Sequence, residues 1–226
     1  MFMDIARSYA GCYGGNPEGR YYFVGIEKGW NRATGELQIQ EPVEDFPCLS
    51  RENPDDTIAL NSYFARHLKL VIGAIRGADP DTVKLADREG DHAWLNLYPL
   101  RRESTDSPWG EEEMELTGFN NKREYYRWCD HYRVPMFREL VKHGERKVIV
   151  GFGVTYRSKF LSSFVAPYRS PKTAPIPLSE YGAKIEVVPV GSKEIDAIVI
   201  APAISKRPTG MGPAECIRLG EILKTL

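Results

Sequence analysis

The chain has 226 residues, of which 42% are hydrophobic and 27% are charged, and its formal net charge is -1. These values exclude a disordered or collagen-like chain and are sufficient for one buried core, so we expect a single globular domain over residues 1–226. No run approaches the ~20 apolar residues of a membrane-spanning helix, and the first residues are too polar for a signal peptide. We therefore expect a cytoplasmic protein without a membrane partner.

The cysteines are scattered along the chain, at positions Cys12, Cys48, Cys129 and Cys216. They form no Cys-x-x-Cys pair, a spacing that zinc sites and iron–sulfur clusters commonly use. The pattern also argues against a disulfide framework. We expect neither a metal nor a cofactor.

Charge is divided unevenly between the two halves of the chain. Residues 1–120 hold 12 Lys and Arg against 21 Asp and Glu, whereas residues 121–226 hold 18 against 10. A basic half can bind phosphates, because the local field matters more than the total charge. Alternatively, the two halves simply neutralise each other in the folded protein.

The first predicted element is a strand. Residues 21–26 form an aromatic and β-branched run that is typical of a buried strand, and Gly29 follows in a loop. Residues 30–53 are polar and proline-rich, which predicts a long irregular loop from which Phe46 packs back onto the body.

A helix and a second strand follow. Apolar residues from Leu60 to Ile75 repeat at helical spacing, and Asp55 or Asp56 can cap this helix. Residues 92–97 predict a second buried strand that ends at the polar Asn96, with a loop over 98–104.

The second half of the chain contains further elements of both kinds. An amphipathic helix from Tyr125 is kinked at Pro135, or a new helix begins there and runs to Gly144. A buried strand (146–152), a short helix (160–164) and a basic loop (166–178) follow. The last elements are an edge strand with Pro189 (185–190), a fourth buried strand (195–200) and a helix (213–226). Continuous apolar strands that alternate with helices predict an α/β fold, with three layers and a central four-stranded parallel sheet. Ligands of such sheets bind outside the carboxyl ends of the strands.

Short motifs lie at the carboxyl ends of the four predicted strands. In chain order they are Gly25-Ile26-Glu27-Lys28-Gly29-Trp30, Asn96, Gly151-Phe152-Gly153 and Ala201-Pro202-Ala203-Ile204-Ser205-Lys206-Arg207. Taken together they resemble the motifs of the uracil-DNA glycosylase superfamily, a group of base-excision repair enzymes with a four-stranded parallel sheet between helices. The resemblance spans most of the chain and implies a DNA partner. We expect the protein to act as a monomer.

The resemblance implies catalytic roles for Glu27 and Asn96. A carboxylate near the sugar stabilises the oxocarbenium-like transition state of N-glycosidic hydrolysis and can hold the attacking water. An amide reads a pyrimidine edge, because its C=O accepts a hydrogen bond and its NH2 donates one. The remaining expected base contacts are Gly25, Ile26, Lys28, Gly29, Trp30, Phe46 and Tyr98, and the expected DNA contacts are Arg101, Arg102, Ser205, Lys206 and Arg207.

Each of these residues also has a purely structural interpretation. Glu27 could be a solvated loop carboxylate, Asn96 a turn cap, the aromatic residues part of the core, and the cations ordinary surface charges. The family's catalytic histidine is replaced by Ala201, which has no hydrogen-bond donor in its side chain.

These observations predict an atypical glycosylase-like protein that binds DNA and hydrolyses the N-glycosidic bond of a damaged or deaminated base. Two alternatives stay open. The protein could be a non-catalytic nucleic-acid-binding module on the same fold, or an enzyme that acts on a free nucleoside or nucleotide.

Overall fold

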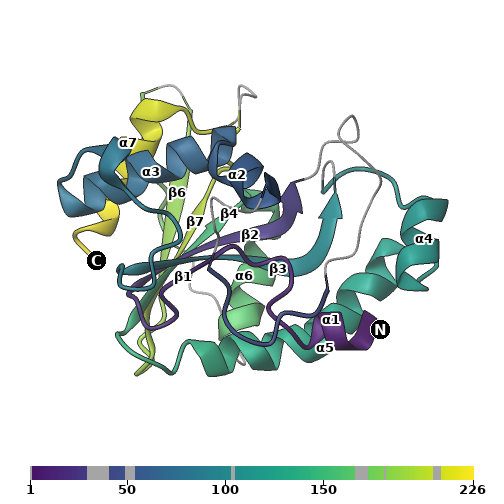
Figure 1. Ribbon diagram of the computed structural model, residues 1–226. Coiled ribbons are helices and arrows are strands. Elements are labelled where there is room, and N and C mark those ends of the chain that lie inside the picture. The colour runs from purple at the N-terminus through teal and green to yellow at the C-terminus, as the bar shows by residue number, and fades with distance from the viewer. Residues whose placement is uncertain are drawn as a thin grey trace.

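The computed structural model describes residues 2–29, 41–48, 54–102, 105–165, 173–180, 182–205 and 210–226. Among these residues, seven strands form one mixed sheet in the order β1-β3-β2-β4-β7-β6-β5 (Figure 1). Their bounds are β1 Gly14–Gly15, β2 Tyr21–Gly29, β3 His92–Arg102, β4 Lys147–Phe152, β5 Ile176–Pro177, β6 Lys184–Pro189 and β7 Ile195–Ala201.

The α/β class is confirmed, but the sheet is larger than the four-stranded parallel one that the sequence predicts. Strand β2 pairs in parallel with β3 and β4, and β4 pairs in parallel with β7. Antiparallel strands extend the sheet on both sides: β1 pairs with β3, β6 with β7, and β5 with β6. Of these, β6 is the strand that the sequence predicts over 185–190, whereas β1 and β5 are only two residues long and leave no periodic pattern in the sequence.

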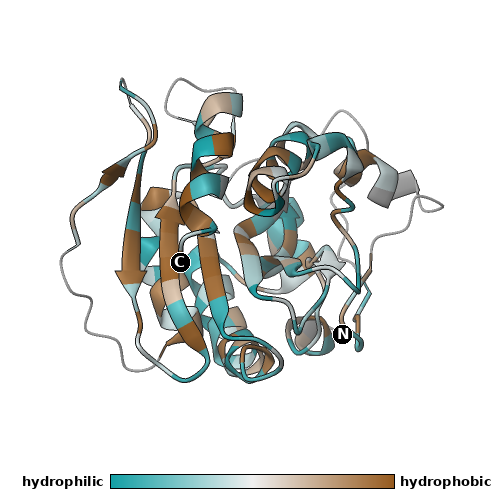
Figure 2. Ribbon diagram, turned by 90° about the vertical axis from the view of Figure 1, so that its left-hand side faces the viewer, coloured by the Kyte–Doolittle hydropathy of each residue, from teal (hydrophilic) through white to brown (hydrophobic). Residues whose placement is uncertain are grey.

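Helices cover both faces of the sheet (Figure 1). Their bounds are α1 Phe2–Ala6, α2 Pro54–Leu60, α3 Tyr63–Arg76, α4 Glu111–Thr117, α5 Lys122–Leu140, α6 Arg157–Phe164 and α7 Pro213–Leu223, with single 3-10 turns at Pro80–Thr82 and Val154–Tyr156. Helices α3 and α7 belong to the core on one face, whereas α5 and α6 belong to the core on the other. In Figure 2 the central strands are largely hydrophobic, as expected for a sheet that is buried on both sides.

The long helix expected from Asp55 or Asp56 to Ile75 is divided in two. Ser62 lies between α2 and α3 in extended conformation, and its hydroxyl oxygen accepts a hydrogen bond from the backbone N–H of Ala65 at 3.1 Å. A serine in this position starts a new helix by satisfying a backbone donor that would otherwise have no partner. The apolar repeat is continuous in the sequence and does not reveal the break.

Strand β3 is longer than expected. The sequence predicts a strand end at Asn96 and a loop over 98–104, whereas β3 continues to Arg102. Asn96 can lie inside a buried strand because its Nδ2 donates to the carbonyl oxygen of Gly11 at 2.7 Å. A polar residue with a partner in the core therefore does not mark the end of a strand.

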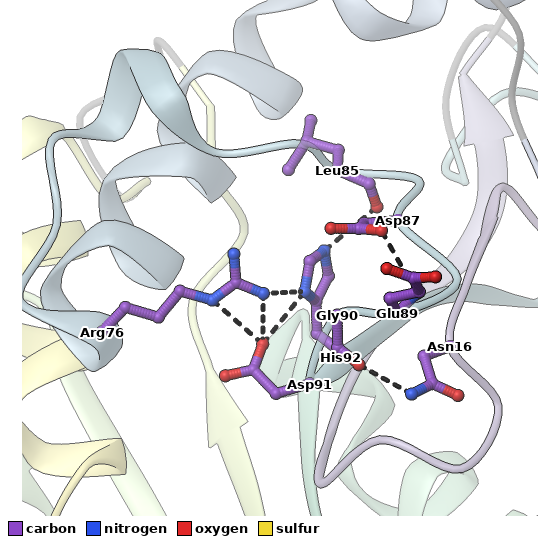
Figure 3. A network of polar contacts seen from close by, with 8 residues as sticks. All are labelled: Asn16, Arg76, Leu85, Asp87, Glu89, Gly90, Asp91 and His92. Carbon is purple, nitrogen blue, oxygen red and sulfur yellow. Dashed lines mark hydrogen bonds and ion pairs between the residues drawn. The ribbon is translucent and has the colours of Figure 1, made fainter.

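A polar network fixes the opposite, amino end of β3 (Figure 3). Arg76, at the end of α3, donates to Oδ1 of Asp91 from Nε at 3.1 Å and from Nη2 at 2.5 Å. The buried His92 ring places Nε2 3.1 Å from the carbonyl oxygen of Leu85 and Nδ1 3.2 Å from Nη2 of Arg76. Asn16 donates to the carbonyl oxygen of Gly90 at 2.7 Å. This network joins the end of α3 to the start of β3.

Candidate active site

The connections of the sheet leave to opposite faces at the carboxyl ends of β2 and β4. The chain passes from β2 to β3 through α3 on one face, and from β3 to β4 through α5 on the other face. In open α/β sheets, ligands bind where successive connections leave to opposite faces. In Figure 1 the arrowheads of β2 and β3 point toward the side of the molecule where α4 lies.

Glu27 is the central residue at this edge. Its Oε1 accepts a hydrogen bond from the hydroxyl of Tyr126 at 2.9 Å, and its Oε2 is buried without a hydrogen-bond partner among the described residues. Burial raises the pKa of Glu27 to about 7, because it outweighs the opposite effects of Lys122, Arg102 and the Tyr126 hydrogen bond. Such a carboxyl group can exchange a proton near neutral pH.

Arg102 brings buried hydrogen-bond donors to the same region. The side chain is 2% exposed, and its Nη2 donates to the carbonyl oxygens of Ser107 at 2.6 Å and Pro108 at 2.9 Å. Its Nε and Nη1 are buried without partners among the described residues. Buried polar atoms of proteins normally have hydrogen-bond partners, so the unpartnered atoms of Arg102 and Glu27 are positions where water or a ligand would bind.

Aromatic side chains and an ion pair from β3, α5 and α6 surround the partner of Glu27, Tyr126. The ring of Tyr126 stacks on that of Tyr98, with 4.1 Å between centroids. The Tyr98 hydroxyl donates to Oδ1 of Asp130 at 2.8 Å, and Nζ of Lys159 forms an ion pair with the same carboxylate. The position of Tyr126 is therefore fixed by stacking on one side and by the Glu27 hydrogen bond at its tip.

The structure brings some of the predicted base-contact residues together in the interior of the sheet. Gly25 lies opposite Asn96 in the register, and a Cβ at Gly25 would lie 2.3 Å from Oδ1 of Asn96. Asn96 is 2% exposed and its amide holds the N-terminal segment through Gly11. Ile26 is also buried.

The aromatic residues expected to contact a base are core residues in this conformation. Phe46 packs edge-on against Tyr9 at 5.3 Å between centroids, and it is 7% exposed. Tyr98 is 1% exposed. Lys28 and Gly29 continue β2, and Trp30 lies outside the described residues.

The expected DNA-contacting residues do not form one group. Arg101 and Arg102 lie in the last positions of β3, where Arg101 is half-buried and Arg102 is buried. Ser205 follows β7 and is half-buried, while Lys206 and Arg207 lie outside the described residues. Ala201, at the end of β7, is fully buried.

Sequence reasoning missed the residues that surround Glu27 from other elements. These are Lys122, Tyr126 and Tyr156, with Lys159 beside the ring of Tyr126. Burial raises the pKa of both tyrosines, and the charge of Glu27 raises it further. For Lys122 and Tyr126, the signal in the sequence is the basic and aromatic character of the first turns of α5. That signal is equally typical of a solvent-exposed helix face.

Comparisons with protein-family models, with curated proteins and with solved structures gave no match. Within the described part of the chain, no group of three or more His, Cys, Asp or Glu could hold a metal ion. No helix in that part is long and apolar enough to span a membrane.

Proposed function

We propose that the protein binds DNA and hydrolyses the N-glycosidic bond of a damaged or deaminated base, as an atypical glycosylase of the uracil-DNA glycosylase type. The observation that supports this proposal is the Glu27 carboxyl group, which is buried at the carboxyl end of β2 with one oxygen unpaired and a pKa of about 7. The parallel pairing of β3, β2, β4 and β7 within the larger sheet also fits the fold that the resemblance implies.

In the proposed reaction, Glu27 acts as the general base. Its Oε2 accepts a hydrogen bond from a water molecule and takes a proton as the water oxygen attacks the sugar carbon. Before this proton transfer, the C–N bond begins to break with its electron pair going to the base, and the carboxylate of Glu27, still ionised, stabilises the positive charge that develops on the sugar. A pKa near 7 keeps a substantial fraction of Glu27 ionised at neutral pH.

Arg102 supplies the charge stabilisation that Ala201 lacks. Negative charge develops on the leaving base, and hydrogen-bond donors that are fixed in a buried site stabilise such charge strongly. The free Nε–H and Nη1–H of Arg102 are donors of this kind. The departing base is then protonated by solvent after it leaves the site.

A second candidate function is a non-catalytic DNA-binding module. It is favoured by Ala201, which is fully buried and offers no donor at the position of the family's catalytic histidine. This candidate predicts DNA affinity without base release.

A base-release assay separates the two candidates. Single- and double-stranded oligonucleotides that carry uracil, hypoxanthine or xanthine are incubated with the wild type, with Glu27→Gln and with Glu115→Gln, an exposed carboxylate of α4 that serves as the matched control. Release that is lost only in Glu27→Gln, with DNA affinity kept within a few-fold, supports the glycosylase. Binding without release supports the non-catalytic module. If the protein neither binds the oligonucleotides nor releases a base, an enzyme that acts on free nucleotides is favoured instead.

A further inference from the structure

A basic pocket lies beside the candidate active site. It has a volume of about 470 Å³ and is lined by Lys122, Arg123, Tyr126, Arg127 and Lys159. The first four belong to the beginning of α5 and the last to α6. None of these residues is among the DNA contacts that the sequence analysis predicts.

The cations of this pocket are incompletely neutralised. Arg123 and Arg127 are exposed and form no ion pair or hydrogen bond with any residue that the structure describes. Lys159 pairs with Asp130, a carboxylate that also accepts from Tyr98. Lys122 donates to the carbonyl oxygen of Thr105, and it faces Glu27, Asp106 and Glu113 at longer range.

An anion would stabilise Lys122 in particular. Burial lowers the pKa of Lys122, and nearby Arg102 lowers it further, although Glu27 has the opposite effect. The helix adds to the positive field, because Lys122 is the first residue of α5 and the backbone N–H groups of a first turn carry a partial positive charge. Four cations and a helix start therefore act on one pocket.

Tyr126 connects this pocket with the catalytic candidate. Its ring lines the pocket, with Nζ of Lys122 5.4 Å and Nζ of Lys159 5.6 Å from the ring centroid, while its hydroxyl donates to Glu27. The sugar of a nucleotide is bonded directly to its phosphate. A phosphate in the pocket would thus bring an adjoining sugar toward Glu27.

We propose that this pocket binds a backbone phosphate of the nucleic-acid strand on which the protein acts. The phosphate oxygens accept hydrogen bonds from Arg123 and Arg127, because guanidinium groups match phosphate geometry. The phosphate also lies near the ammonium groups of Lys122 and Lys159. The choice of nucleic acid as the source of the phosphate rests on the proposed function. The inference that the pocket binds a phosphate depends only on the charges and the volume of the pocket.

The test uses binding of an undamaged, fluorescein-labelled single-stranded oligonucleotide, measured by anisotropy over a series of salt concentrations. Undamaged DNA separates phosphate binding from base excision. The variant is Arg123→Gln with Arg127→Gln, and the control is Arg218→Gln with Lys224→Gln, which removes two exposed cations from α7 and its C-terminal end, on the other face of the sheet. Both double variants therefore change the net charge equally.

The pocket variant should bind more weakly than the control, and the slope of log K against log salt should fall by about 1.4, since each contact with single-stranded DNA contributes ~0.7. An unchanged slope in the pocket variant, or an equal fall in the control, would overturn the proposal. Competition by a nucleoside monophosphate or by inorganic phosphate identifies the source. If the affinity for these small ligands depends on Arg123 and Arg127 but the affinity for DNA does not, the pocket is a phosphate site whose ligand is not a nucleic-acid strand.

The two proposals fail in different ways. If the slope falls in the pocket variant but no oligonucleotide loses a base, the phosphate site stands and the glycosylase reaction is wrong. If bases are released with the same kcat and KM by wild type and pocket variant, the reaction stands and the phosphate site is wrong. If both hold, the pocket variant should raise KM and leave kcat unchanged at saturating DNA.

Discussion

The hydroxyl of Tyr126 donates a hydrogen bond to Oε1 of Glu27 at 2.9 Å and so joins the beginning of α5 to the carboxyl end of β2. This bond favours the ionised form of a carboxyl group whose burial favours the neutral form. The pKa of Glu27, which burial raises, is therefore lowered in part by a residue from another part of the chain.

Replacement of this tyrosine should change the titration of Glu27. In Tyr126→Phe the ring can still stack on Tyr98, but Glu27 loses the hydrogen bond that lowers its pKa, so the pKa should rise above about 7. Carboxyl-carbon NMR titration of wild type and variant measures this shift directly. If base release is found, its acid limb should move to higher pH by the same amount. An unmoved titration would mean that the hydrogen bond does not form in solution.

Glu27 should also make stability depend on pH. Its pKa in the folded state is raised from the ordinary value of 4.5 to about 7, so the folded state holds a proton that the unfolded state releases. The contribution of Glu27 to stability is thus full below about pH 4.5 and is lost as the pH rises to about 7.

The matching comparison is between wild type and Glu27→Gln, which cannot ionise. Relative to the wild type, the variant should gain up to about 3 kcal/mol in free energy of unfolding between these two pH values, at 1.36 kcal/mol for each pKa unit. Urea unfolding at both pH values checks this difference. If the difference in free energy of unfolding between the two proteins is the same at both pH values, the pKa of Glu27 is not raised in the folded state.

Arg133 should be essential for stability. The side chain is 1% exposed and donates to the carbonyl oxygens of Leu97 at 2.6 Å, Ser8 at 2.8 Å and Asn96 at 3.1 Å. Arg133→Met removes all three of these hydrogen bonds, and each buried acceptor that is left without a partner costs about 1–3 kcal/mol. Denaturant unfolding should show a loss of more than about 2 kcal/mol, whereas the exposed Arg123→Met should change stability by less than about 0.5 kcal/mol.

The ion pair between Arg76 and Asp91 should stabilise the fold only while Asp91 is ionised. Burial by itself would raise the pKa of Asp91, but hydrogen bonds with His92 and Arg76 and the Arg76 charge hold it below its usual range. This contribution is present above the unfolded pKa of about 4 and is lost as the pH falls.

Asp91→Asn should therefore lower the thermal midpoint at neutral pH, and the difference from wild type should narrow as the pH falls below about 4. Asp87→Asn, a change in the neighbouring turn, serves as the control for a general effect of charge. A difference that stays equal over the whole pH range would exclude the ion pair as its cause.

The sequence predicts those features that depend on neighbours along the chain. Apolar runs give the positions of β2, β4 and β7, and the repeat from Leu60 to Ile75 gives the apolar face of α3. Glu27 could be expected at a strand end because it directly follows an apolar run. These patterns involve residues that are close together in the chain, so they can be recognised in a single sequence.

The features that the sequence does not predict depend on contacts between residues that are distant from each other in the chain. The extension of β3 past Asn96 requires Gly11 as the partner of the amide, and no local pattern indicates this bond. The cations of α5 have the composition of an ordinary solvated helix face, so only the position of α6 reveals a pocket. The pKa of Glu27 likewise depends on its burial by residues that follow it at a distance.

The contact between Tyr126 and Glu27 joins residues that are 99 positions apart. The ribosome adds Glu27 to the chain long before it adds α5, and Lys159 of the basic pocket follows later still. During synthesis, the emerging chain therefore carries an ordinary, water-exposed acidic side chain at this position. The raised pKa of Glu27 arises only when most of the protein has been made, so in a nascent or prematurely terminated chain this carboxyl group keeps its ordinary pKa.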